Sequence, residues 1–472
     1  METNSDEWSA SSTDAIEISL VVPFEGGSKP LHSFKPTTTS SIFGEDETIS
    51  GYQGLRINIR YNACDMRPGL QIMYKKKTKT ANDRNTLNLK DVLESYLPRS
   101  AFDKTAIFDA AIQDSSYTSW KPPGDLWKTI QSGNQTFEVW KGNLADLAVQ
   151  KTVKRIQILV SFFIEGGTPI ELKEPEWSLR RWTVFFLYHK KKVCPNVPPY
   201  IFMGYSTIYQ YFFVEPARVP SKVETLNFNL PFHHLSLSLL PCRSRISQFI
   251  ILPPFQSGGN GSRFYNAIFD YYLKDNQTVE LTVEDPNEAF DDMRDLNDLA
   301  RLRMIPEFVK IKLNSSLTVS KNSEIPREIV NTSTLEDLRK SIKIAPRQFN
   351  RVFEMQLLSQ LSSPQNDLKT GDPSKNEPKS NRHDYRLWKL LVKSRLFHHN
   401  RDSLIQLDYA DRIEKLEQTL WNVENDYQRL LKAYDKRSSP KVVESLHPVV
   451  DHKRLSSDEV IEDNHVNKKA KV

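Results

Sequence analysis

Apolar residues in the middle of the chain follow two different periods, and these predict an order of strands and helices. Leu55 to Tyr61 alternates apolar with polar residues, as a half-buried strand does. Trp182 to Tyr188 and Tyr200 to Phe213 are almost continuously apolar, which is typical of central strands buried on both faces. Phe249 to Leu252 and Val279 to Val283 are two further expected strands, and the segment between them has apolar residues at helical spacing.

The N-terminal part of the chain predicts an α+β domain, which we place at residues 15 to 140. Residues 1 to 14 are mostly polar and acidic, and we expect them to be disordered. Besides the alternating segment, strands are expected at Ile16 to Val22, Leu70 to Tyr74 and Thr136 to Trp140, and helices at Leu89 to Leu97 and Ala101 to Ile112.

A second domain is expected from residue 141 to 305, and it begins with a helix. Asn143 can cap a helix running from Leu144 to about Ile164, which Gly166 and Gly167 would end. Its residues Leu147, Ile158, Phe162 and Phe163 would face the sheet. Within residues 217 to 243, Leu226 to Cys242 is apolar without a clear period, so we interpret the segment as an inserted loop or an error in the gene model.

The chain beyond Arg303 predicts a helical domain, residues 306 to 434. Helices are expected at Thr334 to Ile342, Pro346 to Leu361, Asp384 to Phe397 and Ser403 to Tyr434, with a flexible linker at 362 to 383 and a disordered tail at 435 to 472. The last helix has apolar residues three and four apart: Ile413, Leu416, Leu420, Val423, Tyr427 and Leu430. This pattern favours packing on neighbouring helices over an intermolecular coiled coil.

Composition excludes few classes of protein, but charge, apolar runs and cysteine spacing give no indication of nucleic-acid binding, membrane insertion or metal binding. The net charge of +5 over 472 residues gives no indication of nucleic-acid binding. No apolar run approaches the length of a membrane span, and the polar N-terminus lacks a signal peptide pattern. The three cysteines, Cys64, Cys194 and Cys242, are far apart, without the spacing of a metal site, which favours a reducing compartment.

The glycine-rich segment Gln256 to Gly261 is the strongest candidate for a binding site. A strand, a glycine loop and a helix start together favour an anion, because loop N–H groups and the helix dipole point at it. Neither common nucleotide motif fits: G-x-x-x-x-G-K is absent, and Phe264 occupies the last glycine position of G-x-G-x-x-G. A glycine-rich surface turn is the competing interpretation.

The pattern Q-x-x-G-x-G at this loop resembles the pyrophosphate loop of the GNAT superfamily of N-acetyltransferases. Further motifs occur in the same order as in the catalytic subunit of type B histone acetyltransferases: Ile42 to Glu47 with Gly51-Tyr52, Ser247-Gln248-Phe249, and Glu284 to Glu288. The resemblance implies an α+β protein with an N-terminal α/β domain, a central GNAT-fold mixed sheet flanked by helices, and a C-terminal helical domain. It also implies acetyl-CoA as co-substrate and no metal.

The resemblance further implies which residues form the site. The pyrophosphate would lie on Gln256, Ser257, Gly258, Gly259, Asn260, Gly261 and Ser262, the pantetheine arm beside the backbone of Phe249, Ile250 and Ile251, and Asn287 close to the cofactor. Glu284, with Asp285 beside it, would be the general base that deprotonates the substrate lysine. The competing interpretation is that both acids only cap the following helix.

The expected substrate is a basic, unfolded histone H-four tail, which acids and flat aromatic rings would suit. The matching positions are Glu45, Asp46, Glu47, Trp182, Tyr209, Gln210 and Tyr211. Tyrosines on a central strand are, however, more often core residues. The family also implies free rather than nucleosomal histone, a WD-repeat histone-chaperone subunit as partner, and a cytoplasmic and nuclear location. Two other functions remain open: a GNAT enzyme acting on a small amine or a protein N-terminus, and a non-catalytic acetyl-CoA-binding scaffold.

Overall fold

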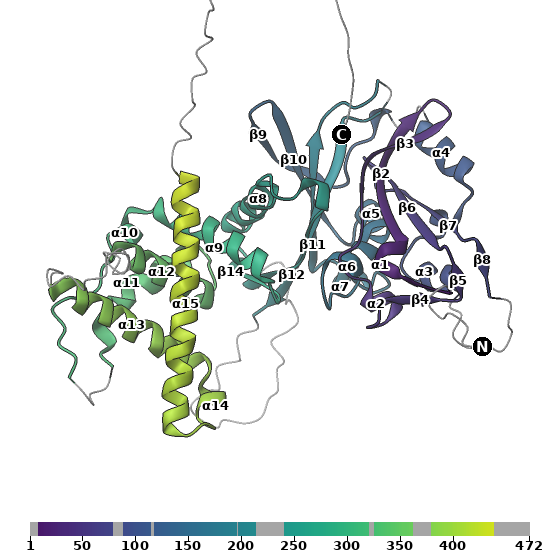
Figure 1. The fold of residues 1–472 in the computed structure, drawn as a ribbon. Helices are drawn as coiled ribbons and strands as arrows, with labels where there is room; N and C mark the ends of the chain where they lie inside the picture. Colours follow the sequence, from purple (N-terminus) through teal and green to yellow (C-terminus); the bar gives the residue numbers. More distant parts are fainter. Residues whose placement is uncertain are drawn as a thin grey trace, which may run out of the picture.

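Three parts follow one another across the computed structural model: an N-terminal α/β part, a central six-stranded sheet and a C-terminal group of helices (Figure 1). The structure describes residues 8–78, 88–114, 118–195, 197–213, 240–320, 325–361 and 379–438. Among them, no helix is both long and apolar enough to cross a membrane.

The N-terminal part is built on a four-stranded sheet in the order β3-β2-β6-β7. Its strands are β2 (Ile16–Phe24), β3 (Gly27–Phe34), β6 (Arg56–Asn62) and β7 (Pro68–Met73), and only the β2–β6 pair is parallel. The predicted alternation is confirmed, since Ile57, Ile59 and Tyr61 of β6 are fully buried. Short elements surround the sheet: α1 (Ser12–Ala15), α2 (Ser40–Phe43), β5 (Tyr52–Gln53), β8 (Lys76–Lys77), α3 (Leu89–Glu94), the 3-10 turn Arg99–Phe102 and α4 (Thr105–Gln113).

The expected disorder of residues 1 to 14 is wrong for the part that the structure describes, Trp8 onward. Strand β1 (Ser9–Ser11) pairs with β4 (Thr48–Ser50). The buried hydroxyl of Ser12 lies 2.5 Å from the Thr39 hydroxyl and donates to the Glu47 carbonyl at 2.7 Å. A polar segment is therefore ordered by hydrogen bonds to residues far along the chain rather than by apolar burial.

The central sheet has the order β14-β13-β12-β11-β10-β9, and every pair is antiparallel except β13–β14. Its strands are β9 (Asp125–Ser132), β10 (Gln135–Asn143), β11 (Trp182–Lys190), β12 (Tyr200–Phe212), β13 (Cys242–Ile251) and β14 (Thr278–Val283). Because β9 and β10 belong to this sheet, the domain boundary expected at residue 140 is wrong. A strand's partner depends on contacts distant in sequence, so local pattern does not reveal which sheet it joins.

Helices cover both faces of the central sheet, which explains the unbroken apolar run of β11. Val184 and Phe186 point into one core, with α5 (Leu147–Ile156), α6 (Ile158–Phe163) and the N-terminal sheet. Phe185 and Leu187 point into the other, with α8 (Asn260–Lys274) and α9 (Glu288–Arg303).

The expected helix from Leu144 to Ile164 is instead the pair α5 and α6, interrupted at Gln157. Asp146 rather than Asn143 caps α5, accepting a hydrogen bond from the Ala148 N–H at 2.8 Å. Leu147 is 78% exposed, contrary to expectation, because it lies on the outer side of the first turn. Ile158 and Phe162 are buried as predicted.

The C-terminal helices pack on the second core. They are α10 (Pro306–Val309), the 3-10 turn Arg327–Ile329, α11 (Thr332–Ser341), α12 (Pro346–Gln360), α13 (Lys379–His399), α14 (Arg401–Leu404) and α15 (Tyr409–Ser438). The seam of α15 packs within the chain at Leu420, Tyr427 and Leu430, as predicted, but Ile413 is 45% exposed. Arg351 of α12 donates two hydrogen bonds to the buried Asp295 of α9, which fixes that helix to the C-terminal group.

Several predicted loops are shorter than expected or lie outside the described residues. Of the 217–243 segment, residues 217–239 lie outside the described residues, and β13 already begins at Cys242. The linker expected at 362–383 ends earlier, because α13 begins at Lys379, and residues 362–378 are not described. Likewise α15 continues to Ser438, and the rest of the expected tail, 439–472, is not described.

Candidate active site

Strand β13 has an open edge where it leaves its parallel neighbour. The pairing of β13 with β14 ends at Ile246 and Val283, whereas β13 continues to Ile251 against β12. The N–H groups of Leu252 and Gln248 point to the β12 side, where they donate to the Met203 carbonyl and the Thr207 hydroxyl. Strand alternation therefore turns the N–H groups of residues 249 and 251 to the open side.

The loop after this edge presents backbone N–H groups that lack an acceptor. None is found within the described protein for the N–H groups of residues 257 to 262, which include the first turn of α8. Gly259 precedes the helix with φ +75°, a left-handed conformation that glycine adopts without strain. The Gln256 side chain folds back and donates to the Ile251 carbonyl at 2.8 Å, which joins the loop to the strand edge. The strand, the loop and the helix start follow one another as the sequence predicts, an arrangement whose N–H groups would suit an anion.

Two of the predicted loop residues face the neighbouring helix. A Cβ on Gly261 would lie 2.9 Å from the Met293 sulfur of α9, so this glycine allows α8 and α9 to pack closely. The Ser262 hydroxyl accepts a hydrogen bond from Asn297 of α9 at 3.0 Å. The side-chain positions of Gly261 and Ser262 thus face α9, while their backbone N–H groups have no acceptor among the described residues.

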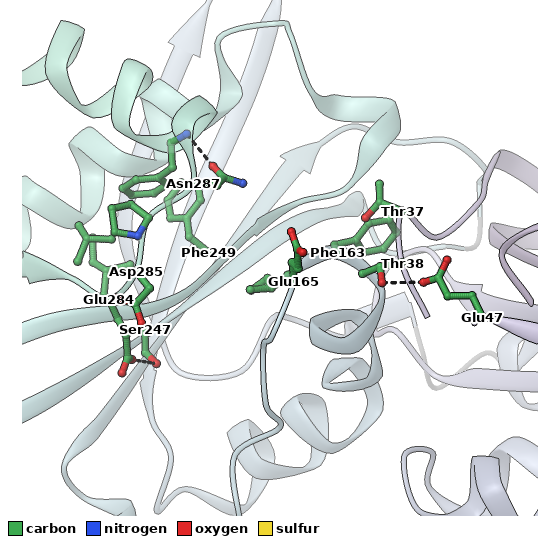
Figure 2. A pocket seen from close by; sticks show the side chains of 15 residues that line it. Thr37, Thr38, Glu47, Phe163, Glu165, Ser247, Phe249, Glu284, Asp285 and Asn287 are labelled. Atoms are coloured by element: carbon green, nitrogen blue, oxygen red, sulfur yellow. Dashed lines mark hydrogen bonds between the residues drawn. The ribbon is translucent and has the colours of Figure 1, made fainter. Parts of the chain in front are cut away.

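A cavity of about 650 Å³, here called the strand-edge cavity, opens at the point where β13 and β14 separate. Ser247, Phe249, Glu284 and Asn287 line one wall, and Glu47 is on the other with Thr37, Thr38, Phe163 and Glu165. Figure 2 shows these two walls, with Glu284 hydrogen-bonded to Ser247 on one and Glu47 to Thr38 on the other. The N-terminal part therefore supplies Thr37, Thr38 and Glu47 to the second wall, and the end of α6 with the residues that follow it supplies the rest.

Glu284 lies at the end of β14, where the last backbone bond of the strand pair, from its own N–H to the Ile246 carbonyl, is 2.9 Å. The Ser247 hydroxyl donates to its Oε2 at 2.6 Å, and the Arg245 guanidinium lies 3.9 Å from its Oε1. Its side chain is 42% exposed. Asp285 follows with φ +34°, and Asn287 caps α9 by accepting from the Phe290 N–H at 2.9 Å. The helix is capped by Asn287, so capping does not require Glu284.

A second cavity, about 770 Å³ and here called the acidic groove, meets the first at Glu165, Ser247, Glu284 and Asp285. Three acids of the segment after α6 line it, Glu165, Glu171 and Glu174, together with the rings of Trp182, Tyr209 and Tyr211. The sequence did not predict these three acids, because they form no motif. Their one signal is the clustering of acids on both sides of the glycine pair at 166–167, ahead of the next strand.

The aromatic residues expected to hold a peptide are brought together. Tyr209 lies 4.7 Å, centroid to centroid, from both Trp182 and Tyr211. Tyr211 is 39% exposed and Tyr209 is half-buried, so the competing assignment of these tyrosines to the core is wrong. Burial raises the pKa of Tyr209, although the nearby Arg181 opposes the shift. Gln210 is not among the groove residues; its backbone bonds to Arg181.

The acidic loop Glu45 to Glu47 is brought to the site only in part. Glu47 lines the strand-edge cavity, and hydrogen bonds from the Thr39 N–H and the Thr38 hydroxyl lower its pKa. Glu45 and Asp46 are exposed and line neither cavity.

The described residues at this junction include neither a cluster of metal-ligand side chains nor a cysteine. Among the described residues, no group of three or more His, Cys, Asp or Glu side chains is placed to hold a metal ion. Cys64 and Cys242 are buried, and burial raises the pKa of both thiols. None of the cysteines lines either cavity.

Two family models match the chain. Residues 8–165 match "Histone acetyl transferase HAT1 N-terminus", and residues 295–362 match "Fungal HAT1, C-terminal". Both models describe parts of histone acetyltransferases, and the curated relatives that follow show the class: the protein is an acetyltransferase.

Curated relatives cover almost the whole chain. The type B histone acetyltransferase catalytic subunit of Gibberella zeae is 42% identical over 99% of this chain and 98% of its own length. That of Neurospora crassa is 44% identical over 90% and 88%, and that of Candida albicans is 31% identical over 90% of each. The chain belongs to this family of type B histone acetyltransferase catalytic subunits, which are protein-lysine N-acetyltransferases.

Proposed function

We propose that this protein transfers acetyl from acetyl-CoA to lysines in the tail of free, newly made histone H-four, with Glu284 as general base. The observation that carries the proposal is that two unlike cavities meet at Glu284. One has a backbone edge suited to a cofactor, and the other has acids and rings suited to a basic peptide.

The cofactor supplies an activated thioester, and the residues on the strand-edge side fit it. The unpaired N–H groups of residues 257 to 262 suit the diphosphate, at the positive end of α8. The N–H groups on the open edge of β13 suit the pantetheine amides, and the N–H of Phe249 suits the carbonyl oxygen that gains charge during transfer. In this proposal the central sheet is a GNAT fold.

Glu284 is well placed to take a proton from the lysine. An ammonium of pKa about 10.4 must lose a proton before its nitrogen can attack. The Ser247 hydroxyl fixes the Glu284 carboxylate, and partial exposure allows the proton to pass on to water. The new C–N bond then forms as the C–S bond breaks, the nitrogen loses its second proton, and the leaving thiolate takes up a proton to become the thiol of coenzyme A. Glu165 and Asp285 also line both cavities and are the other carboxylates available to the incoming ammonium.

The groove supports a peptide rather than a small amine as acceptor. Its acids attract a chain with several positive charges, and its rings can cover lysine stems and glycine backbone. Binding to a WD-repeat histone-chaperone subunit and a cytoplasmic and nuclear location are proposed from the family resemblance alone.

One assay tests the proposal. Labelled acetyl-CoA is incubated with free histones, nucleosomes and polyamines under the same conditions. We expect label on the H-four tail of free histones, little on nucleosomes and none on polyamines. Acetylation of polyamines without peptide preference would favour a small-amine acetyltransferase, and cofactor binding without turnover would favour a scaffold.

A further inference from the structure

The loop proposed to hold the diphosphate has a conformation that needs support. Ser257 has φ +62° and Gly259 φ +75°, so two left-handed residues lie within three positions. A serine in this region carries backbone strain that glycine does not. Alternation of left- and right-handed residues turns successive N–H groups toward one side, which suits an anion. A loop in this form must be held by contacts made on its other side.

Arg263, one turn into α8, makes those contacts. Its Nη1 donates to the Gly258 carbonyl at 2.7 Å and to Asn260 Oδ1 at 2.8 Å. Its Nη2 donates to the Ser132 hydroxyl at the end of β9 at 3.0 Å, and the guanidinium lies 5.1 Å from the Phe137 ring centroid. One side chain thus joins the loop, the helix start and the neighbouring hairpin.

Asn260 extends this set of bonds toward the strand. It is only 8% exposed, and its Nδ2 donates to the Phe255 carbonyl at 2.8 Å while its Oδ1 accepts from Arg263. The carbonyls of residues 255 and 258 are therefore bound on the inner side. The N–H groups of residues 257 to 262 remain without an acceptor in the described protein.

We propose that Arg263 is a positioning residue for the cofactor: it holds the loop in its anion-accepting form through its forked hydrogen bonds, and it does not itself bind the phosphates. The inference rests on the proposed cofactor role of this loop. An arginine beside a phosphate loop would ordinarily be assigned to the phosphate. Here both N–H groups of Nη1 and one N–H of Nη2 are engaged with protein oxygens, and these bonds require the planar fork that lysine lacks.

The test uses Arg263→Lys and Arg263→Gln in the full chain, with two acetyl donors. Acetyl-CoA carries the diphosphate, whereas S-acetylpantetheine does not, so only the first depends on the loop. We expect both variants to raise the KM for acetyl-CoA about tenfold, the scale of one lost charge-assisted hydrogen bond. The KM for S-acetylpantetheine and the kcat at saturating acetyl-CoA should stay at the wild-type values, which also shows that the variants are folded.

Three results would overturn the inference. If Arg263→Lys keeps wild-type affinity for acetyl-CoA while Arg263→Gln loses it, the charge and not the fork is needed, and Arg263 is a phosphate ligand. A KM for acetyl-CoA unchanged in both variants would mean that the loop holds its own shape. Equal losses with both donors would mean general misfolding of the site.

Measurements on the wild-type protein distinguish a failure of the Arg263 role from a failure of the cofactor role proposed for the loop. If wild-type protein uses S-acetylpantetheine as well as acetyl-CoA, the loop does not bind the diphosphate, and its proposed cofactor role fails. If the wild type discriminates between the donors and both variants do so equally well, only the role of Arg263 fails.

Discussion

The two cavities that meet at Glu284 differ in the groups that would contact a ligand, which are mainly backbone groups in one and side chains in the other. The strand-edge cavity lies along backbone, at the open edge of β13 and the start of α9, and the glycine loop that continues this edge lies outside its lining. The acidic groove depends on side chains, with Glu165, Glu171 and Glu174 facing the Trp182, Tyr209 and Tyr211 rings. Only the residues at the junction belong to both.

This difference decides how each cavity should respond to change. Backbone donors are fixed by the fold, so side-chain replacement matters mainly where it alters the backbone conformation. Exposed carboxylates act through charge, and in 0.1 M salt the interaction between exposed charges decays over a Debye length of about 10 Å. Cofactor binding should therefore be sensitive to glycine replacement, and peptide binding to charge and ionic strength.

Replacing the junction residue should have the largest effect. We expect Glu284→Gln to lower kcat at pH 7 by about 10²–10⁴, the usual contribution of a general base. Acetyl-CoA affinity, measured by isothermal titration, should hardly change. Glu288→Gln is the matched control, because that acid of α9 has a side chain 90% exposed and lines neither cavity. Near-normal turnover by Glu284→Gln would show that Glu284 is not the base, and Glu165 would be the next carboxylate to test.

Charge reversal in the groove should come next. The double change Glu171→Lys with Glu174→Lys should raise the KM for tail peptide about tenfold or more at low salt, as attractive contacts become repulsive. The effect should shrink at high salt, and the KM for acetyl-CoA should stay constant.

The pair Glu45→Lys and Asp46→Lys sharpens this comparison. Those carboxylates line neither cavity, so we expect a smaller rise in peptide KM. An equal or larger rise would show that the upstream acidic loop reads the tail outside the groove. If neither pair of substitutions changes the KM for tail peptide, these charges do not contribute to tail binding.

A smaller effect is expected from Gly259→Ala. The left-handed conformation costs an alanine about 1 kcal/mol, enough to lower acetyl-CoA affinity roughly fivefold if the loop shifts to relieve it. Peptide KM should not change, and added salt should not restore the lost affinity. Gly26→Ala is the control, since Gly26 has φ +82°, has free space for a Cβ and lies in the distant β2–β3 turn. Equal losses in both variants would indicate general destabilisation.

The smallest effect is expected from replacing the cysteines. Exchange of Cys64, Cys194 and Cys242 for serine or alanine should leave kcat within about twofold, because direct attack by lysine needs no acyl-enzyme. The buried thiols have raised pKa values and lie outside both cavities. Loss of turnover in a stable triple variant, with acetyl-cysteine isolated from the wild type, would contradict this mechanism.

Local pattern predicted those parts of the site that lie on one continuous stretch. The strand, loop, helix and second strand from Cys242 to Val283 appear in the predicted order, and Asn287 begins the next helix. The observed element and domain boundaries differ from the predicted ones where they depend on contacts between residues distant in sequence. Asp146 rather than Asn143 begins α5, and β9 and β10 join the central sheet instead of the N-terminal one. Glu165, Glu171 and Glu174 were missed because acids in a loop look alike whether they face a groove or solvent.

The sequence by itself determined the strands, the glycine loop and the family motifs, because alternation, helical spacing and glycine positions are local properties of the chain. Only the tertiary structure decided that Glu47, Glu165 and Glu284, which belong to three separate segments, line one cavity. It also decided that Glu45 and Asp46 lie outside that cavity and that Gly261 serves helix packing. The reason is physical. Whether a side chain faces a partner or solvent depends on residues that folding brings together, and the local sequence around that side chain does not show which distant residues those are.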